Sequence, residues 1–347
     1  MRKLMMISFG LALSACAGTN GLPPSTPATV APSLAAAAHS AVLRAIATAN
    51  LYVVNYAGNS VTVYDSTGKN ELRTISQGLD VPVALAFDGS GDLYVANYSS
   101  STVTVYAKGG GSVLRTISSG VNEPYVLAFD GSGKLYVANL GTNTVTVYAP
   151  GSGKVLRTIS KGVDAPEALA FDGSGNLYAA NNGSAGTVTV YTAGKTLSRT
   201  ISQGVSEPDA LAFDGSGNLY VANYNGDTTG NVTVYVAGSG TPLRTVSQGV
   251  SYPEKVAFDD AGKLYVANTA TSGGGSVTVY ASGGTSLLRT ITHGVNQPYA
   301  LAFHGHDDLY VANLSANTVT LYARNRASVR RTISEGLTEP NALLFGP

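Results

Sequence analysis

The sequence predicts an all-β fold, a seven-bladed β-propeller in which each blade is a four-stranded antiparallel sheet. The motif Leu-Tyr-Val-Ala-Asn recurs seven times, with at most one substitution, at intervals of 42 or 45 residues. Each interval holds four short runs of β-branched, aromatic and aliphatic residues, separated by clusters of Gly, Ser, Asn and Asp. A period of about 40 to 50 residues with four strands in each unit is typical of propellers.

The first 15 residues have the pattern of a secretion signal. Two basic residues precede an apolar run over 4–13 that is too short to span a bilayer. The run ends in Leu-Ser-Ala-Cys, which resembles the lipobox of bacterial lipoproteins, and Cys16 is the only cysteine of the chain. That resemblance implies a signal peptide over residues 1–15 and lipidation of Cys16. An ordinary cleavage site with an incidental cysteine is the alternative.

The lipobox also implies a location and a means of attachment. A lipidated Cys16 would anchor the protein at the bacterial cell envelope through more than one acyl chain, the condition for stable attachment. Ala17 follows the cysteine where an inner-membrane retention signal has Asp, so the outer membrane is favoured in a cell that has one. Residues 16–49 are rich in Ala, Pro, Thr and Ser and match no repeat, so we expect a tether there and the propeller over 50–347.

The second repeat unit shows the four expected strands in order. They span residues 82–87, 93–97, 102–106 and 114–118, and we number them first to fourth within a blade. An Asp-Gly-Ser-Gly turn joins the first two strands, because these residue types tolerate positive φ. A proline starts the first strand, where its missing N–H costs least. The second strand is apolar on both faces, as expected of a strand between two neighbouring sheets.

The ends of the chain predict how the ring closes. The array begins with a second strand at residue 51 and ends with a first strand at residues 340–345. We therefore expect the C-terminal strand to join the N-terminal blade, which gives seven complete blades. Residues 40–46 compete for the same place, but they lack the proline and the phenylalanine and would put Arg44 in the most crowded strand.

The recurring pattern Pro-x-x-Leu-Ala-Phe-Asp-Gly-Ser-Gly-Asn-Leu-Tyr-Val-Ala-Asn resembles the NHL repeat and, more loosely, the YncE and SMP-30/gluconolactonase-like propellers. The resemblance covers residues 50–345 and implies the propeller fold. It implies no single function, because such propellers serve as binding modules and as enzymes. It departs from NHL usage at the end of the second strand, where Asn stands in all seven copies in place of the usual Asp.

Side chains that are identical in every blade are expected to serve the blade, since a ligand seldom has seven-fold symmetry. The motif asparagines are therefore expected to satisfy turn backbone groups. The arginines of the fourth strands are expected to act as edge charges against sheet-to-sheet aggregation. Function should lie where the repeats differ.

The differences gather at one end of the ring, which we call the top end. First strands start there and second strands end there. The spacing from the motif Asn to the third-strand Val is 6 residues in most units, 7 in the fourth, and 9 in the fifth and sixth. Tyrosines outside the repeated positions and unbalanced acids flank the same segments. The candidate ligand-binding residues are Tyr125, Tyr252, Tyr299, Glu123, Glu167, Glu207, Asp209, Glu254 and Glu339.

These residue types suit a binding surface. Aromatic rings and carboxylates together recognise sugars, basic peptide segments or cations. We therefore predict a non-enzymatic binding or scaffolding module for a protein, peptide or glycan. The alternative for these residues is a solubilising role only. Nucleic acid is not an expected partner, because the 21 basic residues are balanced by 21 acidic ones.

The second functional hypothesis is an enzyme. The SMP-30-like resemblance implies a metal-dependent lactonase or lyase with a divalent ion at the channel mouth. The candidate ligands for Ca²⁺ are Glu123, Glu207 and Glu339, since Ca²⁺ prefers oxygen ligands. No Ser-His-Asp arrangement and no phosphate-binding Gly loop can be singled out in the sequence, so no catalytic residue is predicted.

Overall fold

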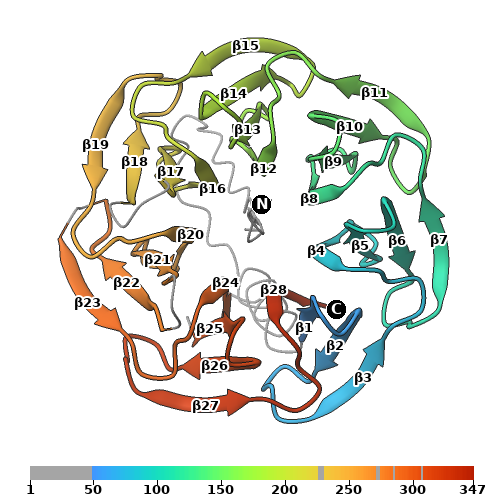
Figure 1. Cartoon of the computed structure of the whole chain (residues 1–347), viewed down its shortest axis with the longest axis vertical. Helices are drawn as coiled ribbons and strands as arrows, with labels where there is room; N and C mark the ends of the chain where they lie inside the picture. Colours follow the sequence, from blue (N-terminus) through green and yellow to red (C-terminus); the bar gives the residue numbers. More distant parts are fainter. Residues whose placement is uncertain (1–48, 226–229, 271–273, 284–285, 306–307) are drawn as a thin grey trace, which may run out of the picture.

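The computed structural model describes residues 49–225, 230–270, 274–283, 286–305 and 308–347. These residues form seven four-stranded antiparallel sheets arranged in a ring (Figure 1), which confirms the predicted propeller. None of them lies in a helix long and apolar enough to cross a membrane. The predicted signal peptide, Cys16, the tether up to residue 48 and the competing segment 40–46 lie outside the described residues.

Six blades run from the axis outward in chain order, and in the seventh the last strand of the chain is innermost (Figure 1). The innermost strands are β4 (Pro82–Phe87), β8 (Pro124–Phe129), β12 (Pro166–Phe171), β16 (Pro208–Phe213), β20 (Pro253–Phe258), β24 (Pro298–His304) and β28 (Pro340–Gly346). The second strands are β1 (Asn50–Asn55), β5 (Leu93–Asn97), β9 (Leu135–Asn139), β13 (Leu177–Asn181), β17 (Leu219–Asn223), β21 (Leu264–Asn268) and β25 (Asp308–Asn313). The third strands are β2 (Ser60–Tyr64), β6 (Thr102–Tyr106), β10 (Thr144–Tyr148), β14 (Thr187–Thr192), β18 (Asn231–Tyr235), β22 (Ser276–Tyr280) and β26 (Thr318–Tyr322). The outer strands are β3 (Glu71–Ile75), β7 (Val113–Ile117), β11 (Val155–Ile159), β15 (Thr196–Ile201), β19 (Pro242–Val246), β23 (Leu287–Ile291) and β27 (Val329–Ile333).

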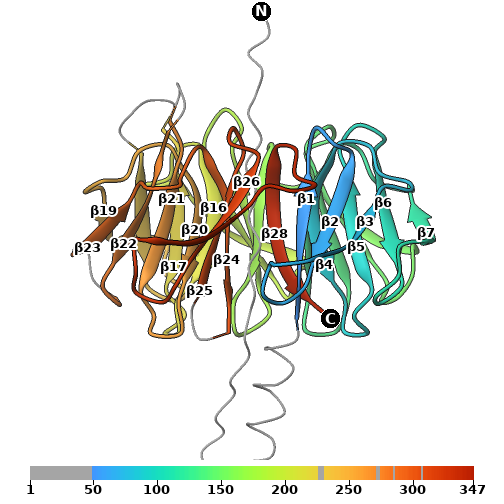
Figure 2. The same ribbon diagram turned by 90° about the horizontal axis from the view of Figure 1, so that it is seen from below.

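The C-terminal strand closes the ring as predicted. Strand β28 pairs antiparallel with β1 in the order β28-β1-β2-β3, with Leu51 opposite Phe345. The Tyr52 hydroxyl also donates a hydrogen bond of 2.9 Å to the carbonyl of Pro347. Figure 2 shows β28 beside β1, with the C-terminus at the end opposite to the top end. One sheet therefore contains both ends of the described chain.

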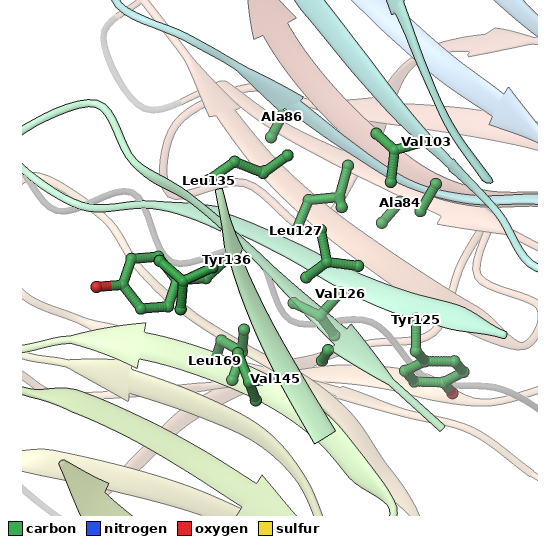
Figure 3. Close-up of a cluster of buried hydrophobic side chains, with 14 of the residues drawn as sticks. Ala84, Ala86, Val103, Tyr125, Val126, Leu127, Leu135, Tyr136, Val145 and Leu169 are labelled. Atoms are coloured by element: carbon green, nitrogen blue, oxygen red, sulfur yellow. The ribbon is translucent and has the colours of Figure 1, made fainter. Parts of the chain in front are cut away.

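The core lies between neighbouring blades. Second and third strands are buried on both faces, because each sheet is covered by the sheets on either side. The motif tyrosine of each blade packs edge-on against the phenylalanine of an adjacent innermost strand, as in the pair Tyr52 and Phe87 with ring centroids 5.0 Å apart. Figure 3 shows one cluster that spans three neighbouring blades, from Ala84 through Leu127 to Leu169. The repeated apolar positions thus join the blades.

The repeated polar positions serve the scaffold. The Asn97 side chain is representative: Oδ1 accepts from the N–H of Asp80 at 3.3 Å, and Nδ2 donates to the hydroxyls of Thr102 and Thr104. All seven motif asparagines accept such a bond from the link that precedes an innermost strand, which confirms their structural role.

The outer-strand arginines make hydrogen bonds that the sequence did not reveal. In six blades the guanidinium donates to the motif tyrosine hydroxyl of its own blade.

Candidate functional site

The links that enter the innermost strands define the rim of the top end. The residue before each proline has a φ between 45° and 50°, the left-handed region. Its carbonyl accepts a hydrogen bond from the N–H that follows the motif asparagine, for example Tyr98 N to Val81 O at 3.0 Å. These rim residues are Val81, Glu123, Ala165, Glu207, Tyr252, Gln297 and Glu339. Their backbone is held in one conformation, so the rim differs from blade to blade only in its side chains.

A second ring of residues lies two positions further along the chain, on the other side of each proline. The residue after each proline sits at a bulge, where the register between innermost and second strand shifts. We call these residues the axial ring: Val83, Tyr125, Glu167, Asp209, Glu254, Tyr299 and Asn341. Each is at most 5% exposed. The Tyr125 hydroxyl lies in the field of Glu167, Asp209, Glu254 and Tyr299, which come from four other blades, so these side chains converge on the axis.

Glu167 and Asp209 form a hydrogen-bonded carboxyl pair. Burial raises the pKa of Asp209 well above its usual range, and the charge of Glu167 raises it further. Burial also raises the pKa of Glu167, while hydrogen bonds from Asp209 and Asn182 partly offset this shift. The Asn182 amide in addition donates to Asp209 Oδ1 at 2.7 Å. Burial therefore favours the protonated form of both carboxyl groups, and in the hydrogen bond between them Asp209 is the donor and Glu167 the acceptor.

A lysine stands beside these acids. Lys255 of β20 occupies the position at which the other innermost strands have Ala or Val, and it lines a cavity on the axis together with Ala84, Ala210 and Ala300. It is 6% exposed. Burial lowers the pKa of its ammonium group to about 7, although Glu254, Asp209 and Glu167 favour the charged form. The axis thus holds three carboxyl groups and one amine within electrostatic range.

The nine predicted ligand-binding residues divide between the two rings. Five of them belong to the axial ring, namely Tyr125, Glu167, Asp209, Glu254 and Tyr299. The sequence analysis placed these five at the top end, and the bulge after the proline turns them toward the axis. The other four, Glu123, Glu207, Tyr252 and Glu339, remain on the rim, where Glu207 is exposed and the others are half-buried.

The three glutamates proposed as metal ligands belong to blades that are not neighbours. Glu123 precedes β8, Glu207 precedes β16 and Glu339 precedes β28. Glu123 instead accepts a hydrogen bond of 3.1 Å from the Tyr98 hydroxyl. Within the described ranges, no group of three or more His, Cys, Asp or Glu side chains is placed to hold a metal ion.

Three residues of the axial site were not predicted. Lys255 could have been found as the one basic residue in a column of Ala and Val, and Asn341 as the last member of the variable column after the proline. Asn182 carries no such signal. It directly follows a motif asparagine, and only the fold brings its amide to Asp209 of the neighbouring blade.

The buried acids of the axial ring and the longest connections fall on three consecutive blades, β12–β15, β16–β19 and β20–β23, which we call the acidic sector. Their innermost strands carry Glu167, Asp209 and Glu254. Their connections between second and third strands are also the longest: Asn223 pairs with Asn231 and Asn268 with Ser276, whereas Asn97 pairs with Thr102. On the rim of this sector the rings of Tyr224 and Tyr252 lie 5.1 Å apart.

The chain matches no protein-family model, and a search of curated proteins found no match. Solved structures do resemble it. A putative 6-phosphogluconolactonase from Bacteroides fragilis NCTC 9343 aligns with a TM-score of 0.66 at 17% identity, over 86% of this chain and 98% of that one. The WD40 β-propeller domain of Doa1 aligns with a TM-score of 0.65 at 14% identity, over 82% and 92%. Kuenenia stuttgartiensis hydrazine synthase aligns with a TM-score of 0.61 at 17% identity, over 71% and 79%. What they share is the fold.

Proposed function

We propose that this protein is a binding or scaffolding module that engages a protein, peptide or glycan through the acidic sector of its top end. The observation that supports the proposal is that three features occur together on the same blades. The long connections, the buried acids and the tyrosine pair of the rim all belong to β12–β23. Insertions in repeat proteins gather on the binding face, and side chains that vary among repeats are free to serve a ligand.

We place this activity at the bacterial cell envelope, with the propeller held by lipid on Cys16. The support for this location is the resemblance of the first 16 residues to a lipoprotein signal.

The test uses the rim tyrosines as a matched set. Tyr224 and Tyr252 in the sector are replaced together by alanine, and the control replaces Tyr56 and Tyr98, which occupy the same position as Tyr224 in two other blades. All four are half-buried, so the cost in stability should be similar. Residues 50–347 are applied to arrays of peptides and of oligosaccharides. Signals should fall at least about tenfold in the sector variant, as expected for loss of aromatic hot spots, and persist in the control. Equal signals from both variants would refute the assignment to the sector.

The second candidate is a metal-dependent lactonase or lyase. It is favoured by the Bacteroides fragilis structure, which bears the name of a lactonase and is aligned over nearly its whole length. It ranks second because Glu123, Glu207 and Glu339 lie on separate blades. Elemental analysis of the purified protein and thermal unfolding with added Ca²⁺ test it. A stoichiometric divalent ion, or a clear rise in Tm with Ca²⁺, would promote it over the binding module.

A further inference from the structure

We propose that a pocket at the end of the ring opposite to the top end binds one neutral sugar unit. The pocket lies between the blades β12–β15 and β16–β19, which are neighbours in the ring (Figure 1), and has a volume of about 370 Å³. Its lining includes residues of the turn over 172–176, which joins β12 to β13, and Ala237 and Gly238 of the turn that follows β18. The site is separate from the top-end surface proposed above, so either one can fail without the other.

A short hairpin borders the pocket in the first of these blades. Tyr191 of β14 pairs with Leu197, six positions further along the chain, whereas Tyr148 of β10 pairs with Val155, seven positions further. The other five blades have the spacing of Tyr148. The hairpin between β14 and β15 is therefore one residue shorter than its six counterparts.

The shorter hairpin uncovers the turn between the first and second strands of its blade. Five such turns have a glycine with positive φ at the same position: Gly91, Gly133, Gly175, Gly217 and Gly262. In four of them a Cβ added to the glycine would lie within 4 Å of a hairpin side chain of the same blade, as Gly133 would with Pro150. Around Gly175 no atom of the described residues lies within this distance. The turn over 172–176 thus faces open space.

Small side chains also keep the pocket open. Ser198 occupies a position at which one other unit has Arg330 and the remaining five have Leu. Ala237 occupies the position of Lys108 and Pro150 in two other units. Longer side chains at either position would take up part of the space between the two blades.

The lining changes from a buried floor to an exposed mouth. The floor is formed by Tyr178 and Val190, which are each 3% exposed. Half-buried Asp172, Asn176 and Arg199 form the walls. The mouth has exposed residues with hydroxyl groups, namely Ser174, Thr192 and Ser198. The pocket is therefore open to solvent and presents hydroxyl groups at its entrance.

The walls have one positive and one negative group, which offset each other. Arg199 donates from Nη1 to the carbonyl of Gly238 at 2.7 Å and from Nη2 to the Tyr178 hydroxyl at 2.9 Å. The Asp172 Oδ1 atom accepts from the N–H of Asn176, and Oδ2 accepts from the Asn176 amide, both at 2.8 Å. An anion would meet Asp172 and a cation would meet Arg199, so the site favours a neutral ligand.

Hydrogen-bonding capacity and size define the ligand class. Each terminal nitrogen of Arg199 keeps a second N–H, and the hydroxyl groups at the mouth can donate as well as accept. A sugar matches these groups, because its hydroxyls also do both and its C–H faces can pack against Val190 and Tyr178. The volume is near the lower end of the range of about 300 to 1,000 Å³ for ligand pockets, which suits a single sugar ring.

Ligand-observed NMR titrations of the whole protein test the ligand class. The neutral probes are the methyl glycosides of glucose, galactose, mannose and N-acetylglucosamine. Glucuronate and glucosamine supply a negative and a positive charge, and 2-(hydroxymethyl)tetrahydropyran has the ring without its ring hydroxyls. At least one neutral glycoside should bind more tightly than these three compounds, because the walls carry no net charge and offer partners for hydroxyl groups.

Two substitutions to the residues of other units test the location. Ser198→Leu should weaken binding about tenfold or more, because the longer side chain takes up space at the mouth. Thr192→Ala removes one hydroxyl and should weaken binding about fivefold. Both variants should fold, since five other units have Leu and four have Ala at these positions. The matched control is Leu288→Ser, the reverse change in β23, which should leave affinity within about twofold.

Arg199→Lys tests the guanidinium group, with Arg289→Lys as its control. Both arginines donate to the motif tyrosine of their own blade, so both variants should lower Tm by similar amounts. Only Arg199→Lys should also weaken sugar binding, by about fivefold. A purely structural role would leave the two variants with the same affinity.

Three results would overturn the proposal: no neutral glycoside binds, a charged probe or the tetrahydropyran binds at least as tightly as every neutral glycoside, or Ser198→Leu and Leu288→Ser change affinity equally. On the oligosaccharide arrays, signals that Ser198→Leu removes belong to this pocket, and signals that depend on Tyr224 and Tyr252 belong to the top end. Loss of one set therefore leaves the other proposal standing.

Discussion

Replacing Asn55 by alanine tests whether the two ends of the chain close the ring in solution. The Asn55 side chain is fully buried. Its Oδ1 atom accepts a hydrogen bond of 3.1 Å from the N–H of Thr338, 283 residues away in the link before β28. Its Nδ2 atom donates to the hydroxyls of Ser60 at 3.0 Å and Thr62 at 2.8 Å. One side chain therefore joins the first blade to the last link.

The expected loss follows from these three hydrogen bonds. Each contributes about 1 kcal/mol net, and a partner left buried without a bond costs more. Two of the three hydrogen-bond partners can still form other hydrogen bonds, which limits the loss of stability. Thr338 is exposed, so its N–H can bind water, and the Thr62 hydroxyl still donates to the carbonyl of Gly336 at 2.9 Å. Asn55→Ala should therefore lower the free energy of unfolding by about 2 to 3 kcal/mol.

Urea unfolding measures this loss, with far-UV circular dichroism and tyrosine fluorescence as probes, because the chain has 20 tyrosines and no tryptophan. The matched control is Asn97→Ala. Asn97 makes the equivalent three hydrogen bonds, but its link partner Asp80 is only 17 residues away. The two variants should lose the same free energy within about 0.5 kcal/mol. A loss for Asn55→Ala that is smaller than the loss for Asn97→Ala by about 1 kcal/mol or more, the contribution of the bond to Thr338, would show that β28 does not close the ring.

Three further predictions concern the axis, the closing strand and the anchor. Burial lowers the pKa of Lys255 to about 7, so above that pH this residue binds a proton in the unfolded chain and not in the folded one. The free energy of unfolding should therefore rise from about pH 7 to about pH 10. Lys255→Met should flatten this rise in urea titrations, and an unchanged slope would contradict the prediction. Gly346→Ala should cost about 1 to 3 kcal/mol in urea unfolding, since the new Cβ would overlap the ring of Phe87. Gly215→Ala, which faces open space, should stay within about 0.5 kcal/mol, and equal losses would argue against tight packing at Gly346. Cys16→Ser should move the protein from the membrane fraction to the soluble fraction, and retention in the membrane would exclude a lipid anchor at this residue.

Much of the fold could be predicted because its cause is local and repeated. Alternating apolar residues, turn residues at constant spacing and the starting proline determine each blade without reference to the others. The closing strand was predictable too, since the motif numbering leaves one second strand at the start and one first strand at the end. The scaffold role of the asparagines followed from their identity in all seven units, and the hydrogen bonds of Asn97 confirm it.

The candidate site was predicted only in part, because a bulge decides its geometry. The residues on both sides of the proline vary, and the sequence does not show which of them faces the axis. Glu207, before the proline, adopts a left-handed backbone and stays exposed on the rim, whereas Asp209, after it, enters the axis. Lys255 became important for the same reason. It is one basic side chain among many in the sequence, and only burial beside three carboxyl groups changes its chemistry.

By itself, the sequence determined the strands, the number of blades, the order of closure and the end of the ring at which the repeats differ. These depend on the spacing of residues within one unit of the chain. Only the tertiary structure decided that Glu167, Asp209, Glu254 and Lys255 share one buried site with Tyr299. The physical reason is that residues about 42 to 45 positions apart meet when the blades close around an axis, and charge and burial then act across blades that the sequence presents as separate units.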